Sequence, residues 1–243
     1  MPKNPWETVK GVINNSDIVL YLLDARFPED SRNHDLEKML KRTGRKCICV
    51  FTKSDLAKND FSPPKGLRPY VLVSAKDFHG IRKLNEKIIL ESRKIKGRLP
   101  KIGIVGYPNI GKSSLSNALK GKNSARTSPE PGFTKGMQFI NTGHFMLIDT
   151  PGVVPRGEKS SLRHVRMSIE TIYTEDADIA AMTLIGNFPE KIKEIFGVEI
   201  TEDKEEVLGK IALKKSLVLK GGEPDIMRAA KLVLKHYQGG RLF

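Results

Sequence analysis

The segment GYPNIGKS, from Gly106 to Ser113, has the glycine, lysine and serine spacing of a phosphate-binding loop. It follows an apolar run that should form a strand and opens a segment that should form a helix. In such a loop, backbone N–H groups surround phosphate oxygens, the lysine brings a positive charge to the β and γ phosphates, and the serine hydroxyl ligates a metal ion. The residues expected to contact the ligand here are Tyr107, Pro108, Asn109, Ile110, Gly111, Lys112, Ser113 and Ser114.

Two segments downstream could complete a metal and γ-phosphate site. DTPG begins with Asp149 at the end of an expected strand, where its carboxylate can hold Mg²⁺ through water, and Gly152 can offer its N–H to the γ-phosphate. Thr134, within PGFTKG, is the candidate for a threonine that joins the metal only when a γ-phosphate is present. We therefore expect Ser113, Thr134 and Asp149 around Mg²⁺, and Lys112, Thr134 and Gly152 in catalysis.

Two segments upstream carry groups suited to a guanine base. TKSD contains Asp55, whose carboxylate can accept hydrogen bonds from guanine N1 and N2, while adenine offers no matching pair of donors. Lys53, next to Thr52, can cover the ring with its aliphatic stem. VSAK follows the next expected strand and resembles the element whose backbone N–H meets guanine O6; its candidates are Ser74, Ala75 and Lys76. These segments predict GTP and GDP as ligands and disfavour an ATP-dependent phosphotransferase.

The order of the segments is unusual, because TKSD and VSAK precede GYPNIGKS, PGFTKG and DTPG. This order resembles the circularly permuted GTPases of ribosome biogenesis, and within them the YlqF/RbgA-like group. Supporting segments are LLDARFPEDSRN, which contains Asp24, Ala25 and Arg26, then GYPNIGKSSL, and GGEPDIMRAAKLVL near the carboxyl end. The resemblance covers nearly the whole chain and implies a GTP-hydrolysing switch that assists assembly of the large ribosomal subunit.

Departures from related patterns bear on hydrolysis. Thr52 stands where many GTPases have asparagine, and Val153 stands where Ras-like proteins have the glutamine that orients water. No histidine precedes His34, whereas the closest family members often carry one near the amino terminus. We expect slow intrinsic hydrolysis, stimulated by ribosomal particles. Asn109 matches an asparagine that coordinates potassium in several GTPases lacking the glutamine; the alternative is an amide that braces its loop.

The elements that must hold these segments form an alternating pattern typical of α/β proteins. We expect strands at 18–25, 46–51, 70–73, 102–105, 138–141 and 145–148, with helices at 31–42, 81–96 and 112–119. After residue 155 the pattern is helical, at 162–173, 176–184, 189–196, 202–214 and 224–237. The sequence therefore predicts a three-layer P-loop NTPase domain over residues 1–154, in permuted order, and a small all-α, RNA-binding domain over residues 155–243.

The composition of the chain bears on its partner and on its location in the cell. The formal charge is +14, and its excess lies almost wholly in residues 1–154. Such an excess favours a polyanionic partner, here ribosomal RNA or a large-subunit precursor, although solubility is the alternative. A signalling or RNA-modification GTPase with a protein partner is the rival function. Cys47 and Cys49 should be buried, reduced thiols rather than metal ligands. No apolar run could span a membrane, and MPKNPWETVK lacks the apolar core of a signal peptide, so we expect a cytoplasmic protein. We also expect a monomer.

Overall fold

The structure is a computed structural model that describes residues 5–57, 61–120, 126–127, 138–149 and 177–242. The chain divides into two compact units, residues 1–157 and 158–243. The boundary expected after residue 154 and the helix expected at 162–173 fall outside the described residues, so both stay predictions. Within the described part of the chain, no helix combines the length and apolarity needed to cross a membrane.

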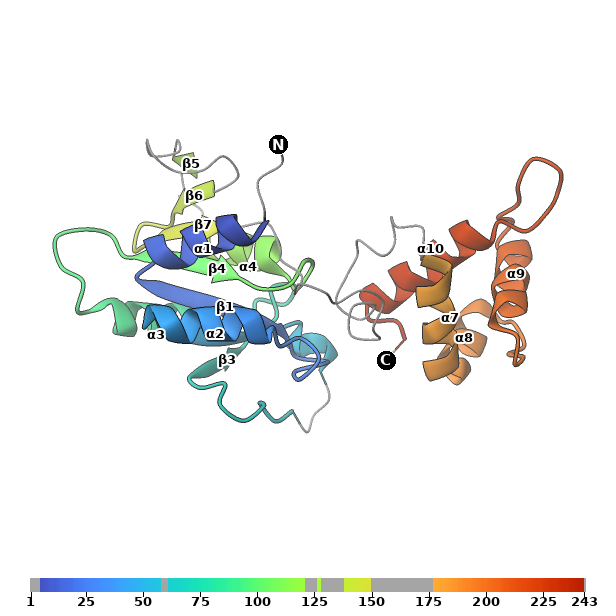
Figure 1. Ribbon diagram of the computed structural model, residues 1–243, viewed down its shortest axis with the longest axis horizontal. Helices are drawn as coiled ribbons and strands as arrows, with labels where there is room; N and C mark the ends of the chain where they lie inside the picture. The colour runs from blue at the N-terminus through green and yellow to red at the C-terminus, as the bar shows by residue number, and fades with distance from the viewer. Residues whose placement is uncertain (1–4, 58–60, 121–125, 128–137, 150–176, 243) are drawn as a thin grey trace. The chain divides into compact units, whose positions relative to one another are not determined.

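The first unit is built on a seven-stranded sheet with the order β3-β2-β1-β4-β7-β6-β5, shown in Figure 1. The five strands from β3 to β7 in that order run parallel, whereas β6 is antiparallel to β7 and β5 is antiparallel to β6. All seven residues of β1 are buried, as expected for a central strand covered on both faces. The strand bounds are β1 Ile18–Asp24, β2 Lys46–Thr52, β3 Tyr70–Leu72, β4 Lys101–Val105, β5 Arg126–Thr127, β6 Gln138–Asn141 and β7 Met146–Asp149.

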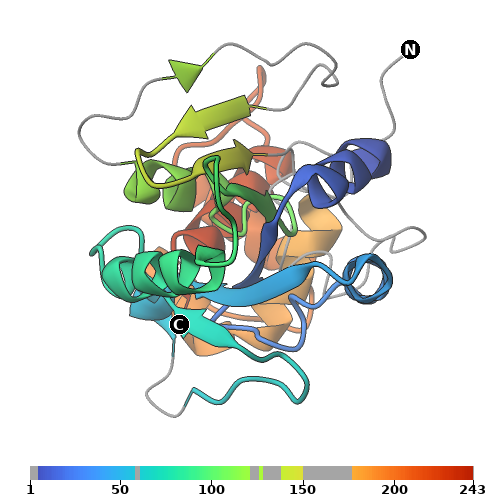
Figure 2. The ribbon, with the colours of Figure 1, turned by 90° about the vertical axis from the view of Figure 1, so that its left-hand side faces the viewer.

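Helices cover both faces of the sheet, which confirms the predicted three-layer α/β fold. Figure 2 shows α1 (Pro5–Asn15) and α2 (His34–Thr43) on one side, and α3 (Ile81–Ser92) and α4 (Lys112–Leu119) on the other. The apolar faces of α1 and α2 pack against alternate residues of the strands and form a core with them. Its members include Val9 of α1, Leu36 of α2, and the strand residues Tyr21, Phe51 and Ile148. Cys49 is buried, as predicted, whereas Cys47, the second residue of β2, is only half-buried; both are free thiols.

Helix α1 was not predicted from the sequence. Val9, Val12 and Ile13 are fully buried on one face of it, a pattern too short to stand out next to Gly11. The helix lies close to β4, where a Cβ on Gly103 would come within 2.2 Å of the Ser16 hydroxyl. Only glycine at that position allows α1 to approach the sheet so closely.

The permuted chain returns from α3 to β4 through residues 93–100, which join the ends of the conventional order. Arg98 forms a bidentate ion pair with Asp17, with both N···O distances at 2.7 Å, and the backbone N–H of Lys101 donates to the same carboxylate at 2.8 Å. These bonds hold the linker against the start of β1. Helix α3 ends at Ser92 rather than at the expected Lys96, so the basic residues of the linker lie beyond it.

The second unit contains α7 (Ala177–Asn187), α8 (Pro189–Phe196), α9 (Lys204–Lys214) and α10 (Ile226–Gln238) in its described part. Helix α10 packs against α7 and α9, and Ala230, Val233 and Tyr237 are fully buried on its apolar side. The carboxylate of Asp225 caps α10 by accepting from the N–H of Arg228 at 2.9 Å. Pro224, expected in the first turn, therefore precedes the helix.

Candidate functional site

The parallel strands bring the described segments TKSD, VSAK and GYPNIGKS to one edge of the sheet. The loops after β1, β2, β3 and β4 all leave from the carboxyl ends of neighbouring strands, and Asp149 closes β7 at the same edge. In the register of β1 and β2, Asp24 pairs directly with Thr52. TKSD, VSAK and GYPNIGKS, which are far apart in the sequence, thus lie at the carboxyl ends of β2, β3 and β4.

The loop from Gly106 to Gly111 has the tight backbone path that phosphate binding requires. A Cβ on Gly106 would lie 2.9 Å from the backbone oxygen of Leu22, so β1 leaves no room for a side chain there. Gly111 has φ +100° and precedes α4 without a side-chain cap. Tyr107, Pro108 and Ile110 are buried, while Asn109 is exposed with φ 56°.

Lys112 opens α4 and is 7% exposed. Its Nζ donates to the backbone oxygen of Tyr107 at 2.6 Å, so the ammonium group lies across the loop. Ser113 and Ser114 follow in the first turn and are exposed. Because no side chain caps the start of α4, its first backbone N–H groups and the positive end of the helix dipole can bind an anion.

Thr52 connects the TKSD segment to the phosphate loop. Its side chain is nearly buried, and its hydroxyl lies 2.5 Å from the backbone oxygen of Ile110 and 3.1 Å from that of Leu23. A hydroxyl has one proton, and the shorter distance identifies Ile110 as its main acceptor. Threonine therefore braces the loop in this chain although it stands at a position where many GTPases have asparagine.

Lys53 follows in the left-handed conformation, with φ 56°. Its Nζ lies 3.0 Å from Oδ2 of the buried Asp24, which also binds Arg26 at 2.7 Å. Burial alone would raise the pKa of Asp24, but hydrogen bonds and charge from Arg26 and Lys53 lower it below its usual value. Burial lowers the pKa of Lys53, and the nearby negative charge of Asp24 only partly offsets this by favouring the charged ammonium group. The sequence indicated Asp24 and Arg26 only through a family resemblance; strand adjacency was the signal that could have identified them.

Asp55 lies in the short 3-10 helix η1 (Ser54–Leu56), exposed at the sheet edge. The N–H of Ser54 donates to the backbone oxygen of Val73 at 3.1 Å, which joins this loop to the VSAK segment. There, the buried Ser74 hydroxyl accepts from the N–H of Asp77 at 3.1 Å, while Ala75 is half-buried and Lys76 exposed. The two segments expected to recognise the base are therefore neighbours in space.

The groups expected around the γ-phosphate are described only in part. Thr134, Gly152 and Val153 fall outside the described residues, and for Asp149 the structure gives the backbone position at the end of β7. Among described residues, no cluster of three or more His, Cys, Asp or Glu could hold a metal ion. Ser113 offers the hard oxygen that Mg²⁺ prefers. The Mg²⁺ and potassium ligands stay predictions.

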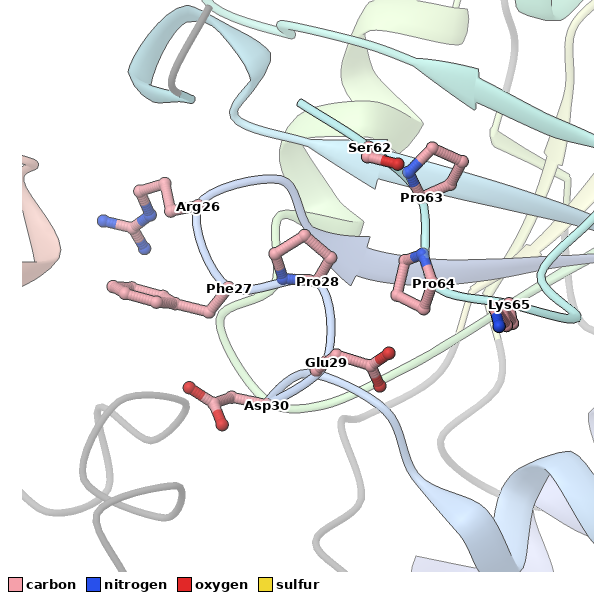
Figure 3. A pocket seen from close by; sticks show the side chains of 9 residues that line it. All are labelled: Arg26, Phe27, Pro28, Glu29, Asp30, Ser62, Pro63, Pro64 and Lys65. Carbon is pink, nitrogen blue, oxygen red and sulfur yellow. The ribbon is translucent and has the colours of Figure 1, made fainter. Parts of the chain in front are cut away.

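A separate hollow of about 500 Å³ lies beside the loop after β1 (Figure 3). One wall is the loop from Arg26 to Asp30, and the other is the segment from Ser62 to Lys65. None of the residues expected to bind the nucleotide lines it. The loop that forms one wall also holds Arg26, which binds Asp24, so the hollow adjoins the residues that contact Lys53 rather than the groups expected to recognise the base.

Comparison with known proteins places this site in a family. Residues 101–218 match the model of the 50S ribosome-binding GTPase family. An uncharacterized GTP-binding protein of Methanocaldococcus jannaschii is 40% identical over 96% of this chain and 65% of its own length. Ribosome biogenesis GTPase A of Bacillus cereus is 29% identical over 93% of this chain and 84% of its length. Nuclear/nucleolar GTPase 2 of Arabidopsis thaliana is 31% identical, and the chain spans 44% of it.

A solved structure of GNP-bound YlqF from T. maritima has the same fold, with a TM-score of 0.62 and 22% identity over 97% of this chain and 94% of that one. The order of the motifs along the chain, the sheet that reunites them and these similarities agree with one another. The chain belongs to the circularly permuted GTPases, in the group related to YlqF/RbgA and nucleolar GTPase 2.

Proposed function

We propose that this protein binds GTP and GDP, hydrolyses GTP, and acts as a nucleotide-controlled switch on ribosomal RNA or a precursor of the large ribosomal subunit. The observation that carries the proposal is the bond from the Thr52 hydroxyl to the Ile110 oxygen, because it joins the segment suited to guanine to the loop suited to phosphates. A ligand that spans both segments must present a guanine base and a phosphate chain together.

In this proposal each segment has a distinct task. Asp55 accepts hydrogen bonds from guanine N1 and N2, and the Ala75 N–H donates to O6. The N–H groups of the Gly106–Gly111 loop and the start of α4 surround the phosphates. Lys112, whose Nζ lies on the Tyr107 oxygen, turns toward the β and γ phosphates and neutralises their charge.

Mg²⁺, held by Ser113 with Thr134 and, through water, Asp149, would neutralise charge that develops on the phosphates. Gly152 would donate to the γ-phosphate, and Val153, with no polar group, could not orient a water. We therefore propose slow intrinsic hydrolysis that ribosomal particles accelerate. Contacts of Thr134 and Gly152 with the γ-phosphate would bias the helical unit, since the chain leads directly from DTPG into it.

The proposed partner follows from charge and from the relatives. The chain carries a formal charge of +14, and the names of its relatives refer to ribosome biogenesis, to the nucleolus or to 50S binding. A basic protein gains affinity for RNA by releasing counterions from phosphates. This supports a ribosomal partner over a protein partner, whose binding would depend less on salt.

Cosedimentation tests both parts of the proposal. Large ribosomal subunits should carry more of the protein to the pellet when it is loaded with a GTP analogue than with GDP, and raising salt should release it. Lys112→Ala, which should weaken all nucleoside triphosphates alike, serves as the unloaded control. Equal pelleting in both nucleotide states would refute the switch, and no pelleting at low salt would refute the ribosomal partner.

A further inference from the structure

We propose that Asp24 is a positioning residue that fixes Lys53 for its contact with the guanine base; this inference rests on the proposed nucleotide binding. Asp24 closes β1, and β1 lies between β2, which ends just before Lys53, and β4, which leads into the phosphate loop. No part of the TKSD pattern contains Asp24, which lies 29 residues before Lys53.

The carboxylate of Asp24 is saturated with hydrogen bonds. Its Oδ1 accepts from the backbone N–H of Arg26 at 3.0 Å and from Nε of Arg26 at 2.8 Å. Its Oδ2 accepts from Nη2 of Arg26 at 2.7 Å and from Nζ of Lys53 at 3.0 Å. The Asp24 side chain is 1% exposed, so this geometry is fixed by its surroundings.

Two cationic side chains contact this carboxylate, but only one of them is needed to neutralise its charge. A buried carboxylate requires a charged partner, and the planar fork of Arg26, itself 3% exposed, already supplies one with two parallel bonds. Lys53 is 27% exposed and could extend its ammonium group into water. The Lys53 bond is therefore not required to neutralise Asp24, and its main effect is to restrict the lysine stem.

The backbone restricts the other end of the same side chain. Lys53 adopts φ 56° and ψ 39°, a left-handed conformation unusual for lysine, at the start of η1, which also carries Asp55. With the backbone held by η1 and Nζ held by Asp24, the stem is confined beside the carboxylate that should read guanine. A stem ordered before binding loses no rotamer freedom when the base arrives.

The loop after β1 keeps Asp24 in place in turn. The N–H of Asp24 donates to the hydroxyl of Ser31 at 3.0 Å, and that hydroxyl donates to the backbone oxygen of Pro28 at 3.2 Å. Figure 3 shows Arg26 and Pro28 in the loop that makes these contacts. Through Asp24, a loop that contributes nothing to the TKSD or VSAK patterns would set guanine-nucleotide affinity.

The test is a double-mutant cycle on GDP affinity, with Asp24→Asn, Lys53→Met and the combination. We expect Asp24→Asn to weaken GDP about tenfold, and to weaken it little further when Lys53 is already methionine, because coupled residues are non-additive. Asp35→Asn, which removes an exposed carboxylate on α2, is the matched control and should leave GDP affinity unchanged. Losses that multiply in the double variant would overturn the inference, since Asp24 would then act independently of Lys53.

A second measurement applies even if Asp24→Asn does not fold. In the free, ¹⁵N-lysine-labelled wild type, the ammonium resonance that disappears in Lys53→Met should be protected from solvent exchange, unlike that of the 70% exposed Lys38. Exchange as fast as that of Lys38 would overturn the positioning role. Failure of the wild type to bind GDP would instead refute the proposed function itself, so the two failures are distinguishable.

Discussion

Thr52→Val isolates the contact between the segment proposed to bind the base and the loop proposed to bind the phosphates. Valine keeps the shape of the side chain and removes only the hydroxyl that lies 2.5 Å from the Ile110 oxygen. A neutral hydrogen bond contributes about 0.5 to 1.5 kcal/mol, and an acceptor left buried without a partner costs about 1 to 3 kcal/mol. Because Thr52 is only 4% exposed, water cannot simply replace its hydroxyl.

The loss should appear both in folding and in nucleotide binding. Without the brace, the Ile110 segment samples conformations that do not bind phosphates, and the apparent dissociation constant rises by the reciprocal of the competent fraction. A loss of about 1 to 2 kcal/mol corresponds to a factor of about 5 to 30, which we expect in the dissociation constant for GDP. Fluorescence titration with a GDP analogue measures it, and thermal unfolding measures the stability loss.

Two control variants sharpen the test. Thr52→Ser keeps the hydroxyl and should retain most of the affinity. Thr43→Val removes a half-buried hydroxyl that donates to the Leu40 oxygen at 2.9 Å at the end of α2, away from the carboxyl edge of the sheet, and should not change GDP binding. Unaltered GDP affinity in Thr52→Val, or an equal loss in Thr43→Val, would refute the idea that this hydroxyl prepares the phosphate loop.

Four further outcomes are expected. Asp55→Asn should weaken GTP at least about tenfold and favour xanthosine nucleotides in titrations, because charge-assisted bonds of about 1.5 to 3 kcal/mol are lost. Replacing potassium by sodium should slow GTP turnover if Asn109 binds the ion, and equal rates would refute that role. Asp17→Asn should lower the free energy of unfolding by about 1 kcal/mol, since Arg98 is half-exposed. Arg98 lowers the pKa of Asp17, so this difference should be present at neutral pH and shrink as the pH falls below about 3.9, the ordinary carboxyl value. Charge reversal at the three basic residues Arg228, Lys231 and Lys235 of α10 should reduce the slope of RNA affinity against log salt by up to about 0.9 per lost phosphate contact. An unchanged slope would show that this face does not bind RNA.

Strands and motifs were predictable because their signals are local. The apolar run at β1 and the loop before α4 are read directly from residue types and spacing, and the structure has both within a residue or so of the expected bounds. Helix α1 was missed because its burial depends on Gly103, far away in the sequence, which lets it approach β4. A short amphipathic segment carries no local sign of such a partner.

The supports of the site were harder to predict for the same reason. Nothing in TKSD reveals that Thr52 donates to Ile110, 58 residues later, or that Lys53 pairs with Asp24. The Lys53 bond joins the carboxyl ends of the neighbouring strands β2 and β1, whereas the Thr52 bond reaches past β1 to the loop after β4. Both therefore follow from strand order, which the motifs do not specify. The residues expected to contact the ligand can thus be named from patterns, whereas the residues that hold them in place can be named only when the strand order is known.

These cross-strand bonds also explain why a permuted order of motifs can preserve the site. β2, β1 and β4 must lie side by side for Thr52 and Lys53 to reach their partners, but nothing in those contacts depends on which strand comes first in the chain. The joined ends add one requirement, a linker long enough to return from α3 to β4. Residues 93–100 can span up to about 28 Å at about 3.5 Å per residue, and the Asp17 carboxylate fixes the linker at Arg98. Permutation therefore changes the connection at the opposite edge of the sheet from the nucleotide segments and leaves the bonds between those segments intact.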